Sequence, residues 1–213
     1  MDPFAAHRVR AAYDAVADDY VEAFADDLAS LPTDLAALDE AATGMLGDGA
    51  VLDLGCGPGQ VGQHLAAGGA RVVGVDLSPG MLRAGRLRSL LVHAVAGDMR
   101  SLPVRSRSCV GAVAFYSVQH VPRASLPSVL DEVRRVLSPG AAFVIATHLG
   151  DGDVFATELL GHSFDTVGGT MYARDELLGL LRGASFAIET VRERGPLPHE
   201  HPSQRIYVTA RAL

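Results

Sequence analysis

The residues best suited to chemistry lie in one short segment, where an apolar stretch meets a glycine-rich turn. Residues 51–54 read VLDL, and Gly55, Gly57 and Gly59 follow directly, before a helix expected from about residue 60. Glycine allows positive φ and lets a ligand approach the backbone closely. The helix that follows presents unpaired N–H groups and the positive end of its dipole. The segment therefore predicts a site for a nucleotide-like ligand that carries a negative group.

Three carboxylates accompany this turn at the expected ends of parallel strands. Asp53 lies just before the turn, Asp76 ends the second expected strand, and Asp98 lies where the third should end. Ligands of open α/β sheets bind outside the carboxyl ends of the strands, so one crevice is expected to hold all three acids. An acid beside the turn would repel a pyrophosphate. The crevice therefore favours a cationic or amine-bearing ligand.

A dinucleotide-binding site is the main alternative for this segment. Residues 57–62 satisfy G-x-G-x-x-G, and Asp76 follows at about the distance of a ribose-binding acid. The position of Asp53 argues against it, because that carboxylate would face the added negative charge of the pyrophosphate. A nicotinamide-dependent oxidoreductase remains the less favoured interpretation.

Five motifs in sequence order resemble the class I S-adenosylmethionine-dependent methyltransferases, and the resemblance extends from about Tyr13 to the C-terminus. They are the glycine-rich first motif (51–59), the second strand with its ribose-binding acid (72–78), the adenine-binding corner (96–99), the segment after the fourth strand (114–120) and the turn before the fifth (137–140). The resemblance implies an α/β, Rossmann-like, doubly wound seven-stranded sheet. That sheet would be mostly parallel, with a C-terminal antiparallel strand and N-terminal lid helices.

The same resemblance implies S-adenosylmethionine as cofactor and S-adenosylhomocysteine as product. Asp53 would lie near the methionine ammonium, partly through water, and the Gly55 and Gly57 backbone would contact the methionine moiety. Asp76 would accept both ribose hydroxyls, because a charged acceptor makes the stronger hydrogen bond. Asp98 would accept from the adenine amine. The remaining expected cofactor contacts are Cys56, Leu77, Met81, Gly97, Met99, whose backbone N–H would meet a ring nitrogen, and Phe115.

Each of these assignments has a structural alternative. Asp53 and Asp98 are short acids of the kind that hold turns by accepting backbone N–H bonds. Asp76 is a candidate cap for the next helix, although Ser78 with Pro79 at the first helical position is the better one. Leu77 and Met81 also suit core or adenine-edge packing.

Two tyrosines and two histidines are the other candidate site residues. Tyr13 and Tyr20 share one face of an expected helix, which resembles a lid that brings a hydroxyl to the methionine carboxylate; core packing is the alternative. His120 and His148 follow the fourth and fifth strands, where a base could take a proton from an acceptor hydroxyl or protonated amine. His148 is the favoured catalytic candidate, and a loop histidine bonded to backbone is the alternative for both.

The elements that must position these residues alternate as a parallel α/β sheet requires. Strands are expected near 50–54, 71–75, 92–95, 109–115, 141–147, 186–192 and 205–211. Helices are expected near 9–29, 33–43, 60–67, 79–88, 123–137 and 173–183. Residues 148–171 are expected to be a loop that lines an acceptor pocket, with Phe164, Met171 and Tyr172 making it partly apolar. Glu200 and Arg205 flank a loop that either reaches this pocket or is pinned by an ion pair.

Length and composition predict one domain over residues 1–213. Its parts would be lid helices (1–45), a cofactor-binding core (46–147), and an acceptor-pocket loop with a C-terminal hairpin (148–213). The 48% hydrophobic content suffices for one core. The chain has no long apolar run or signal-like N-terminus, which indicates a cytoplasmic protein without a membrane partner.

Charge and cysteine content narrow the function further. The net charge is −7 and the basic residues, all arginine, are scattered, which argues against a nucleic-acid partner. Cys56 and Cys109 are expected to be small buried thiols, and no metal is expected. The sequence thus predicts a monomer or homodimer that methylates an oxygen or nitrogen of a small, partly apolar molecule in specialised metabolism. A cofactor-binding cyclase or sensor that does not methylate is the other alternative.

Overall fold

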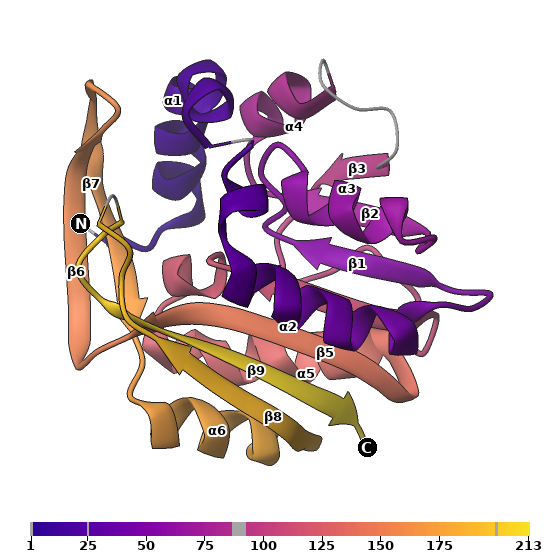
Figure 1. Cartoon of the computed structure of the whole chain (residues 1–213). Helices are drawn as coiled ribbons and strands as arrows, with labels where there is room; N and C mark the ends of the chain where they lie inside the picture. Colours follow the sequence, from indigo (N-terminus) through magenta and orange to yellow (C-terminus); the bar gives the residue numbers. More distant parts are fainter. Residues whose placement is uncertain (1, 25, 87–92, 199) are drawn as a thin grey trace.

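The computed structural model describes residues 2–24, 26–86, 93–198 and 200–213, and its centre is a single sheet of seven strands (Figure 1). The strand order is β3-β2-β1-β4-β5-β9-β8. Neighbours from β3 to β5 are parallel, and β9 runs antiparallel to both β5 and β8. The bounds are β1 Ala50–Leu54, β2 Val72–Asp76, β3 His93–Ala96, β4 Cys109–Phe115, β5 Leu137–Leu149, β8 Phe186–Arg194 and β9 Gln204–Ala212. The predicted doubly wound sheet with one antiparallel strand is confirmed.

Helices cover both faces of this sheet because side chains alternate between the faces along each strand. Leu52 and Leu54 of β1 join a core under α5 and α6, whereas Val51 joins a second core under α2 and α3. The described helices are α1 Ala6–Phe24, α2 Pro32–Ala42, α3 Gln60–Ala67, α4 Pro79–Arg86, α5 Leu126–Val136 and α6 Arg174–Gly183. None of them is long and apolar enough to cross a bilayer. The helix predicted over 79–88 lies partly outside the described residues.

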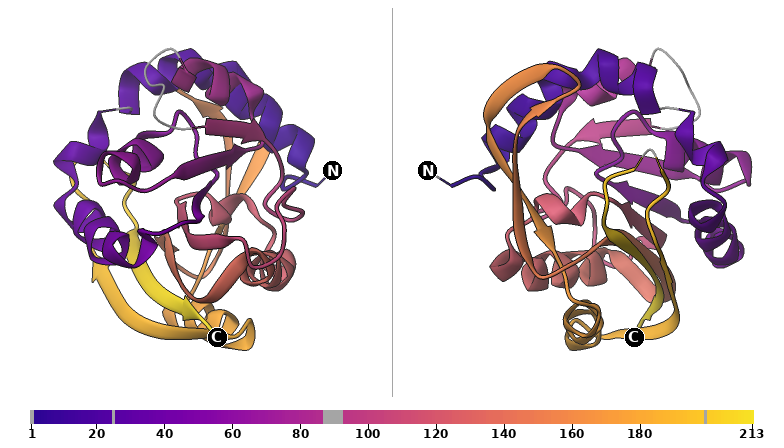
Figure 2. Two further views of the ribbon diagram at one scale, coloured as in Figure 1. Left: turned by 90° about the vertical axis from the view of Figure 1, so that its right-hand side faces the viewer. Right: turned by 60° about the vertical axis from the view of Figure 1, so that its left-hand side comes forward.

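The predicted loop over 148–171 is wrong. Most of it forms an antiparallel hairpin of β6 (Gly152–Leu159) and β7 (His162–Met171). Leu160 and Gly161 make its turn with φ of 52° and 79°, the positive values of a two-residue hairpin turn. Leucine is an unusual first turn residue, so the sequence carries a weak hairpin signal. A lone hairpin is barely stable in water, and here β7 packs on α1 (Figure 2).

Two other expected boundaries shift. β5 begins at Leu137 rather than near residue 141, so the strand includes the residues 137–140 that were predicted as a turn. Gly140 has φ of 79°, and the pairing register with β4 slips beside it. At the N-terminus, α1 ends at Phe24 instead of continuing to residue 29, and a short 3₁₀ turn follows at Asp27–Ser30. The lid helix is therefore shorter than predicted.

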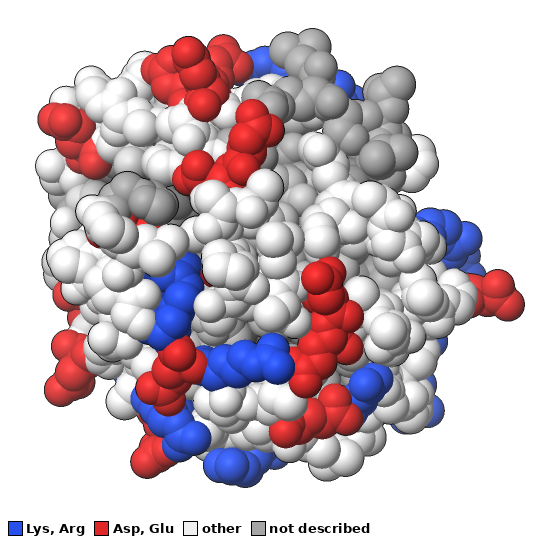
Figure 3. Space-filling view, in the orientation of Figure 1, with Lys and Arg blue, Asp and Glu red and all other residues white. Residues whose placement is uncertain are grey.

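Charged side chains of both signs are interspersed on the face seen in Figure 3. Several arginines have carboxylate partners, among them Arg192 with Glu40 at 2.7 Å and Arg211 with Glu189 at 3.0 Å. Such exposed pairs contribute little stability each. They show that the scattered arginines of the sequence are largely engaged with neighbouring acids.

The contact between α4 and the glycine turn generates a stability prediction. A Cβ at Gly85 of α4 would overlap the main chain of Pro58, whereas a Cβ at Gly179 of α6 meets nothing within 4 Å. Gly85→Ala is expected to lower the free energy of unfolding by about 1–3 kcal/mol through overpacking. Gly179→Ala, the matched control, is expected to raise it by roughly 0.5–1 kcal/mol through helix propensity. Urea unfolding followed by circular dichroism measures both, and equal effects would contradict the close approach.

Candidate active site

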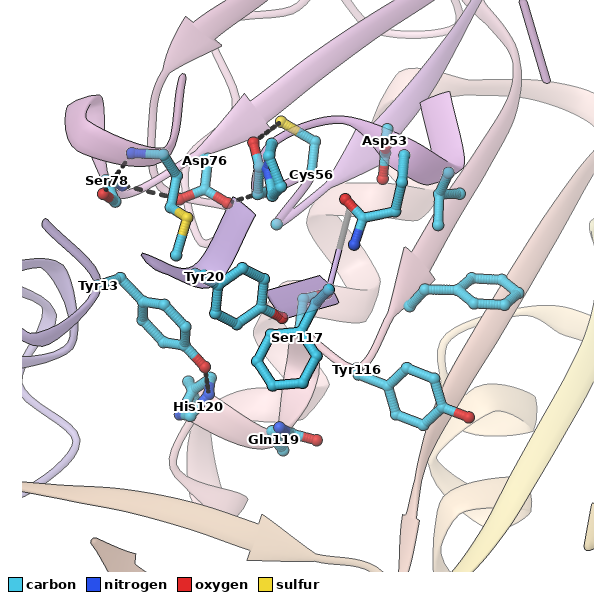
Figure 4. A pocket seen from close by; sticks show the side chains of 18 of the residues that line it. Tyr13, Tyr20, Asp53, Cys56, Asp76, Ser78, Tyr116, Ser117, Gln119 and His120 are labelled. Atoms are coloured by element: carbon cyan, nitrogen blue, oxygen red, sulfur yellow. Dashed lines mark hydrogen bonds between the residues drawn. The ribbon is translucent and has the colours of Figure 1, made fainter. Parts of the chain in front are cut away.

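A cavity of about 530 Å³ opens at the carboxyl ends of β1, β2, β4 and β5. Gly55, Asp76, Tyr116 and His148 each line it immediately beyond or at the end of one of these strands, and Tyr13 of α1 lines it as well. Figure 4 shows Asp76, Tyr116 and Tyr13 around this space. This is the edge at which open α/β sheets bind ligands. The residues differ between the two ends of the cavity, one of which lies at the glycine turn and the other at His148.

The glycine turn forms one end of the cavity. Gly55 and Gly57 have φ of 69° and 53°, and a Cβ at Gly55 would overlap the side chain of Ser117. Ser117 donates a hydrogen bond to the carbonyl oxygen of Leu54 at 2.6 Å, which fixes this close approach. Nothing lies within 4 Å of a Cβ built on Gly57. The turn therefore offers open space beside bare backbone at Gly57.

Asp76 ties this turn to the start of α4. Its two carboxylate oxygens accept the backbone N–H groups of Gly57 and Ser78, each at 2.8 Å. Ser78 in turn accepts the N–H of Met81 at 3.0 Å, so Ser78 is the helix cap, as the sequence favoured. Burial raises the pKa of Asp76. Binding of ribose by Asp76 stays a prediction. The same carboxylate already holds the two turns at Gly57 and Ser78.

Asp53 is the one buried acid here with an unsatisfied oxygen, among the residues that the structure describes. Its side chain lines the cavity and the residue is 1% exposed. The backbone N–H of Gly62 bonds to the carboxylate, while Oδ2 has no partner. Burial, with a smaller contribution from the charge of Asp76, raises the pKa of Asp53 to about 7. The carboxylate thus contacts the first turn of α3, and its Oδ2 is left without a hydrogen-bond partner.

The lid helix α1 is joined to the site by two hydrogen-bonded contacts. Asp14 accepts the Ser78 hydroxyl at 2.6 Å and the Gly80 N–H at 2.8 Å. The Tyr13 hydroxyl lies 2.8 Å from Nε2 of His120 (Figure 4). These contacts place α1 beside the end of the cavity that the glycine turn forms. The expected contact between a tyrosine hydroxyl and a methionine carboxylate stays a prediction.

His120 has both ring nitrogens engaged. Its Nδ1 lies 3.1 Å from the carbonyl oxygen of Gly168. A carbonyl only accepts, so the neutral ring carries its hydrogen on Nδ1 and Nε2 accepts from Tyr13. Burial lowers the pKa of His120 and keeps the ring neutral. The bond to Gly168 matches the alternative of a loop histidine bonded to backbone. Nε2, the nitrogen that could accept a proton, is occupied by the hydrogen bond from Tyr13.

His148 lies at the other end of the cavity, and its Nε2 has no hydrogen bond among those of the described residues. Nδ1 lies 2.7 Å from the hydroxyl of Ser203, and the ring packs against Tyr116 with centroids 5.3 Å apart. Burial and the nearby Arg205 and His201 lower the pKa of His148 to about 4. At neutral pH the imidazole is therefore uncharged and can accept a proton.

A buried polar network beneath this end was missed by the sequence analysis. Asp34 of α2 is 1% exposed and accepts hydrogen bonds from Tyr116 at 3.0 Å, Tyr207 at 2.8 Å and Arg194 at 3.1 Å. Arg194 also binds Glu200 through two hydrogen bonds of 2.6 and 2.8 Å. Tyr116 has φ of 51°, an unusual value for tyrosine that this network maintains. No local motif marks these residues, because their partners are remote in sequence.

The structure brings together all the expected cofactor residues except Asp98. The others line the cavity: Tyr13, Tyr20, Asp53, Gly55, Cys56, Gly57, Asp76, Leu77, Met81, Gly97, Met99 and Phe115. Asp98 lies outside this lining and is held by Arg100, whose Nε donates to its two oxygens at 2.9 and 3.0 Å. Its adenine role stays a prediction. Both candidate histidines line the cavity, and both cysteines are buried free thiols as predicted.

The expected acceptor-pocket residues of the 148–171 region need correction. Tyr172 is fully buried in the sheet core, Phe164 packs against α1, and Met171 lies against Gly150. None of these three residues lines the cavity, although His148 and Leu159 of the same region do. The apolar lining also includes Phe24, Leu28, Leu31 and Phe115. Glu200 and Arg205 do line it, with an ion pair of 3.4 Å between them.

Residues 51–140 match a family model described as a methyltransferase domain. The malonyl-[acyl-carrier protein] O-methyltransferase of Yersinia pestis is 32% identical over 127 residues, which cover 60% of this chain and 45% of the relative. This chain thus spans less than half of that relative's length.

Two solved structures share the fold at low sequence identity. An S-adenosylmethionine-dependent methyltransferase from Methanosarcina mazei superposes with a TM-score of 0.69 at 20% identity, covering 79% of this chain and 95% of that one. The [4+2]-cyclase SpnF also gives a TM-score of 0.69, at 18% identity, covering 97% of this chain and 96% of that one.

The unsatisfied oxygen of Asp53 generates a prediction about pH. A cationic amine binds the ionised carboxylate, so affinity for S-adenosylhomocysteine is expected to rise up to about tenfold per pH unit below about pH 7 and to level off above it. Asp53→Asn cannot ionise and should bind more weakly with little pH dependence. Calorimetric titration between about pH 6 and 8 measures this, with the exposed Asp175→Asn as control. A wild-type affinity that is flat across the same range would contradict the assignment.

Proposed function

We propose that this chain, which matches a methyltransferase-domain model over residues 51–140, is a class I S-adenosylmethionine-dependent methyltransferase that transfers a methyl group to an oxygen or nitrogen of a small, partly apolar acceptor. The observation that carries the proposal is the continuity of one cavity, which runs from the glycine turn with Asp53 to the free imidazole nitrogen of His148. A bound cofactor and an acceptor would meet within that space, and proximity with alignment supplies much of the acceleration of such a step.

The cofactor end suits S-adenosylmethionine on two observations. The buried Oδ2 of Asp53 lacks a partner, and the cofactor carries an ammonium group that can supply one. The open backbone at Gly57 leaves room for the methionine chain. Asp53, Gly55, Gly57 and Asp76 would hold the molecule. When bound, it supplies an electrophilic methyl group on a positively charged sulfur.

The acceptor end favours an uncharged molecule. Its apolar walls include Leu28 and Leu31, and the arginines of the cavity lining already have partners within the protein. Each described arginine that lines the cavity is paired with a carboxylate, Arg10 with Asp14 and Arg205 with Glu200, both at 3.4 Å. A carboxylate acceptor at Arg205 would have to displace Glu200 from a buried ion pair, with the desolvation cost that a charge bears in such a site.

His148 is the base that this arrangement supports. Methylation of a hydroxyl or protonated amine releases a proton, and Nε2 of a neutral imidazole is a suitable acceptor for it. His148 is neutral and its Nε2 is free, whereas Nε2 of His120 accepts a hydrogen bond from Tyr13. The role of His120 would then be to hold α1 in place through Tyr13. The lid helix in turn would exclude water from the reacting groups.

Two measurements test the proposal in sequence. Calorimetry is expected to detect binding of S-adenosylmethionine and S-adenosylhomocysteine but not NAD, because Asp53 disfavours a pyrophosphate. Incubation with a panel of uncharged hydroxyl and amine acceptors is then expected to yield S-adenosylhomocysteine and a methylated product by mass spectrometry. NAD binding would refute the cofactor assignment. Cofactor binding without turnover across a broad panel would favour a non-methylating protein, such as a cyclase or sensor.

Asp76→Ala is expected to weaken binding of S-adenosylhomocysteine by roughly 1.5–3 kcal/mol, the range for losing charged hydrogen bonds. The reason is that one carboxylate would both accept the ribose hydroxyls and hold the turns at Gly57 and Ser78. Calorimetry measures the change, and circular dichroism confirms that the variant is folded. Asp175→Ala, at an exposed carboxylate, is the control. Unchanged affinity in a folded Asp76→Ala variant would refute the ribose role.

A further inference from the structure

We propose that His148, Ser203 and His201 form a relay that carries the acceptor's proton from the cavity to solvent. The inference rests on the proposed function, because the relay has a proton to move only if His148 receives one. It assigns positioning roles to Ser203 and His201, which contact His148 rather than the reacting atoms.

The three side chains form a continuous path. Nδ1 of His148 lies 2.7 Å from the Ser203 hydroxyl, and Nδ1 of His201 lies 3.3 Å from the same hydroxyl. The two rings are edge-on, with centroids 5.9 Å apart. Ser203 is 8% exposed, whereas His201 is an exposed residue. The path therefore begins at His148 in the cavity, crosses one buried hydroxyl and ends at His201, which lines the same cavity and is exposed to solvent.

The hydrogens available determine how this path is organised. A serine hydroxyl has one hydrogen to donate and can also accept, and a neutral imidazole carries one N–H. With Nδ1–H of His148 donating to Ser203 and Ser203 donating to Nδ1 of His201, both contacts are satisfied. His148 then presents a bare Nε2 to the cavity, and His201 presents Nε2–H to solvent. The two histidines are thus expected in opposite tautomers.

Arg205 fixes the geometry of the relay. Its Nη1 donates to the carbonyl oxygens of His201 and Ser203, at 3.0 and 2.5 Å, and Glu200 lies 3.4 Å from its Nη2. The segment that carries both relay residues is therefore held by a guanidinium that is itself paired. The positive charge of Arg205 also disfavours a lasting imidazolium at His148. A proton that His148 receives is therefore more stable after it has moved to Ser203 and His201.

The transfer balances atom by atom. As the acceptor oxygen bonds to the methyl carbon and the carbon–sulfur bond breaks, the acceptor's proton moves to Nε2 of His148. The Nδ1 proton of His148 moves to Ser203, and the Ser203 proton moves to Nδ1 of His201. The Nε2 proton of His201 then passes to water. After product leaves, His201 takes a proton from water at Nε2 and returns its Nδ1 proton to Ser203. Ser203 then returns a proton to Nδ1 of His148, and His148 releases its Nε2 proton to water that has entered the empty cavity.

His120 provides an internal comparison. Its Nδ1 is bonded to the carbonyl oxygen of Gly168, which can accept a hydrogen bond but has no hydrogen of its own to pass on. The path from His120 therefore ends at the backbone. His148 differs because its Nδ1 meets a hydroxyl that is bonded to a second, exposed histidine. This difference does not depend on the pKa of either histidine. It favours His148 as the histidine that can release its proton between turnovers.

The relay predicts a spectroscopic signature that needs no acceptor. Long-range ¹⁵N–¹H spectra of the full chain, saturated with S-adenosylhomocysteine, are expected to show His148 protonated at Nδ1 and His201 at Nε2. Ser203→Ala should change the tautomer distribution of both rings, and Ser203→Thr should restore it. Ser128→Ala, an exposed helix serine, should leave both unchanged. The same tautomer for both histidines in the wild type, or no response to Ser203→Ala, would overturn the relay.

Turnover supplies the second readout once an uncharged acceptor is found. Ser203→Ala and His201→Gln are expected to lower kcat by about tenfold or more, the lower range of proton-transfer catalysis, without changing affinity for S-adenosylhomocysteine. Ser203→Thr should recover most of the loss. Normal kcat in folded Ser203→Ala would refute the relay while leaving the methyltransferase proposal intact. Failure of the wild type to bind the cofactor would instead refute the proposed function.

Discussion

The site depends on a buried carboxylate with one unsatisfied oxygen. The N–H of Gly62 bonds to the Asp53 carboxylate, whose buried Oδ2 has no hydrogen-bond partner, and the residue lines a cavity bounded by bare glycine backbone. Because its pKa in the folded protein is about 7, above its ordinary value, the empty protein loses stability as pH rises between those two values. A cation bound at Asp53 would offset that cost. The ionised Asp53 carboxylate thus destabilises the ligand-free protein, and it would bind a ligand that carries an ammonium group.

The two histidines show how the same residue type is directed to different roles by its second ring nitrogen. His120 is fixed between the Gly168 carbonyl and the Tyr13 hydroxyl, so it connects β7, α1 and the segment after β4. His148 lines the cavity, with Nδ1 bonded to a hydroxyl and Nε2 without a hydrogen bond among the described residues. The charged groups around it, Arg205, Glu200 and Arg194, are paired with one another. That pairing satisfies the charges that lie nearest to His148, the histidine that we propose as the base.

The features that the sequence predicted are those with local signals. The glycine turn, the acids at the ends of β1 and β2, and the Ser78 cap are each specified by residues within a few positions of one another. The features it did not predict depend on remote contacts. Asp34 and Arg194 meet only when α2 packs beside the end of β8, and the β6–β7 hairpin depends on packing against α1. Phe164 and Tyr172 were misplaced for the same reason, because an aromatic residue gives no signal of which side of a hairpin will be covered.

The central claim is that the Asp53 carboxylate recognises a positively charged group of the cofactor, and its ionisation state measures this most directly. Carbon-13 NMR of the side-chain carboxyl, assigned with Asp53→Asn, can follow its titration with and without S-adenosylhomocysteine. The account predicts a pKa near 7 in the empty protein and a clear fall when the ligand is bound, because the ammonium stabilises the ionised form. A pKa that stays unchanged on saturation with the ligand would contradict it.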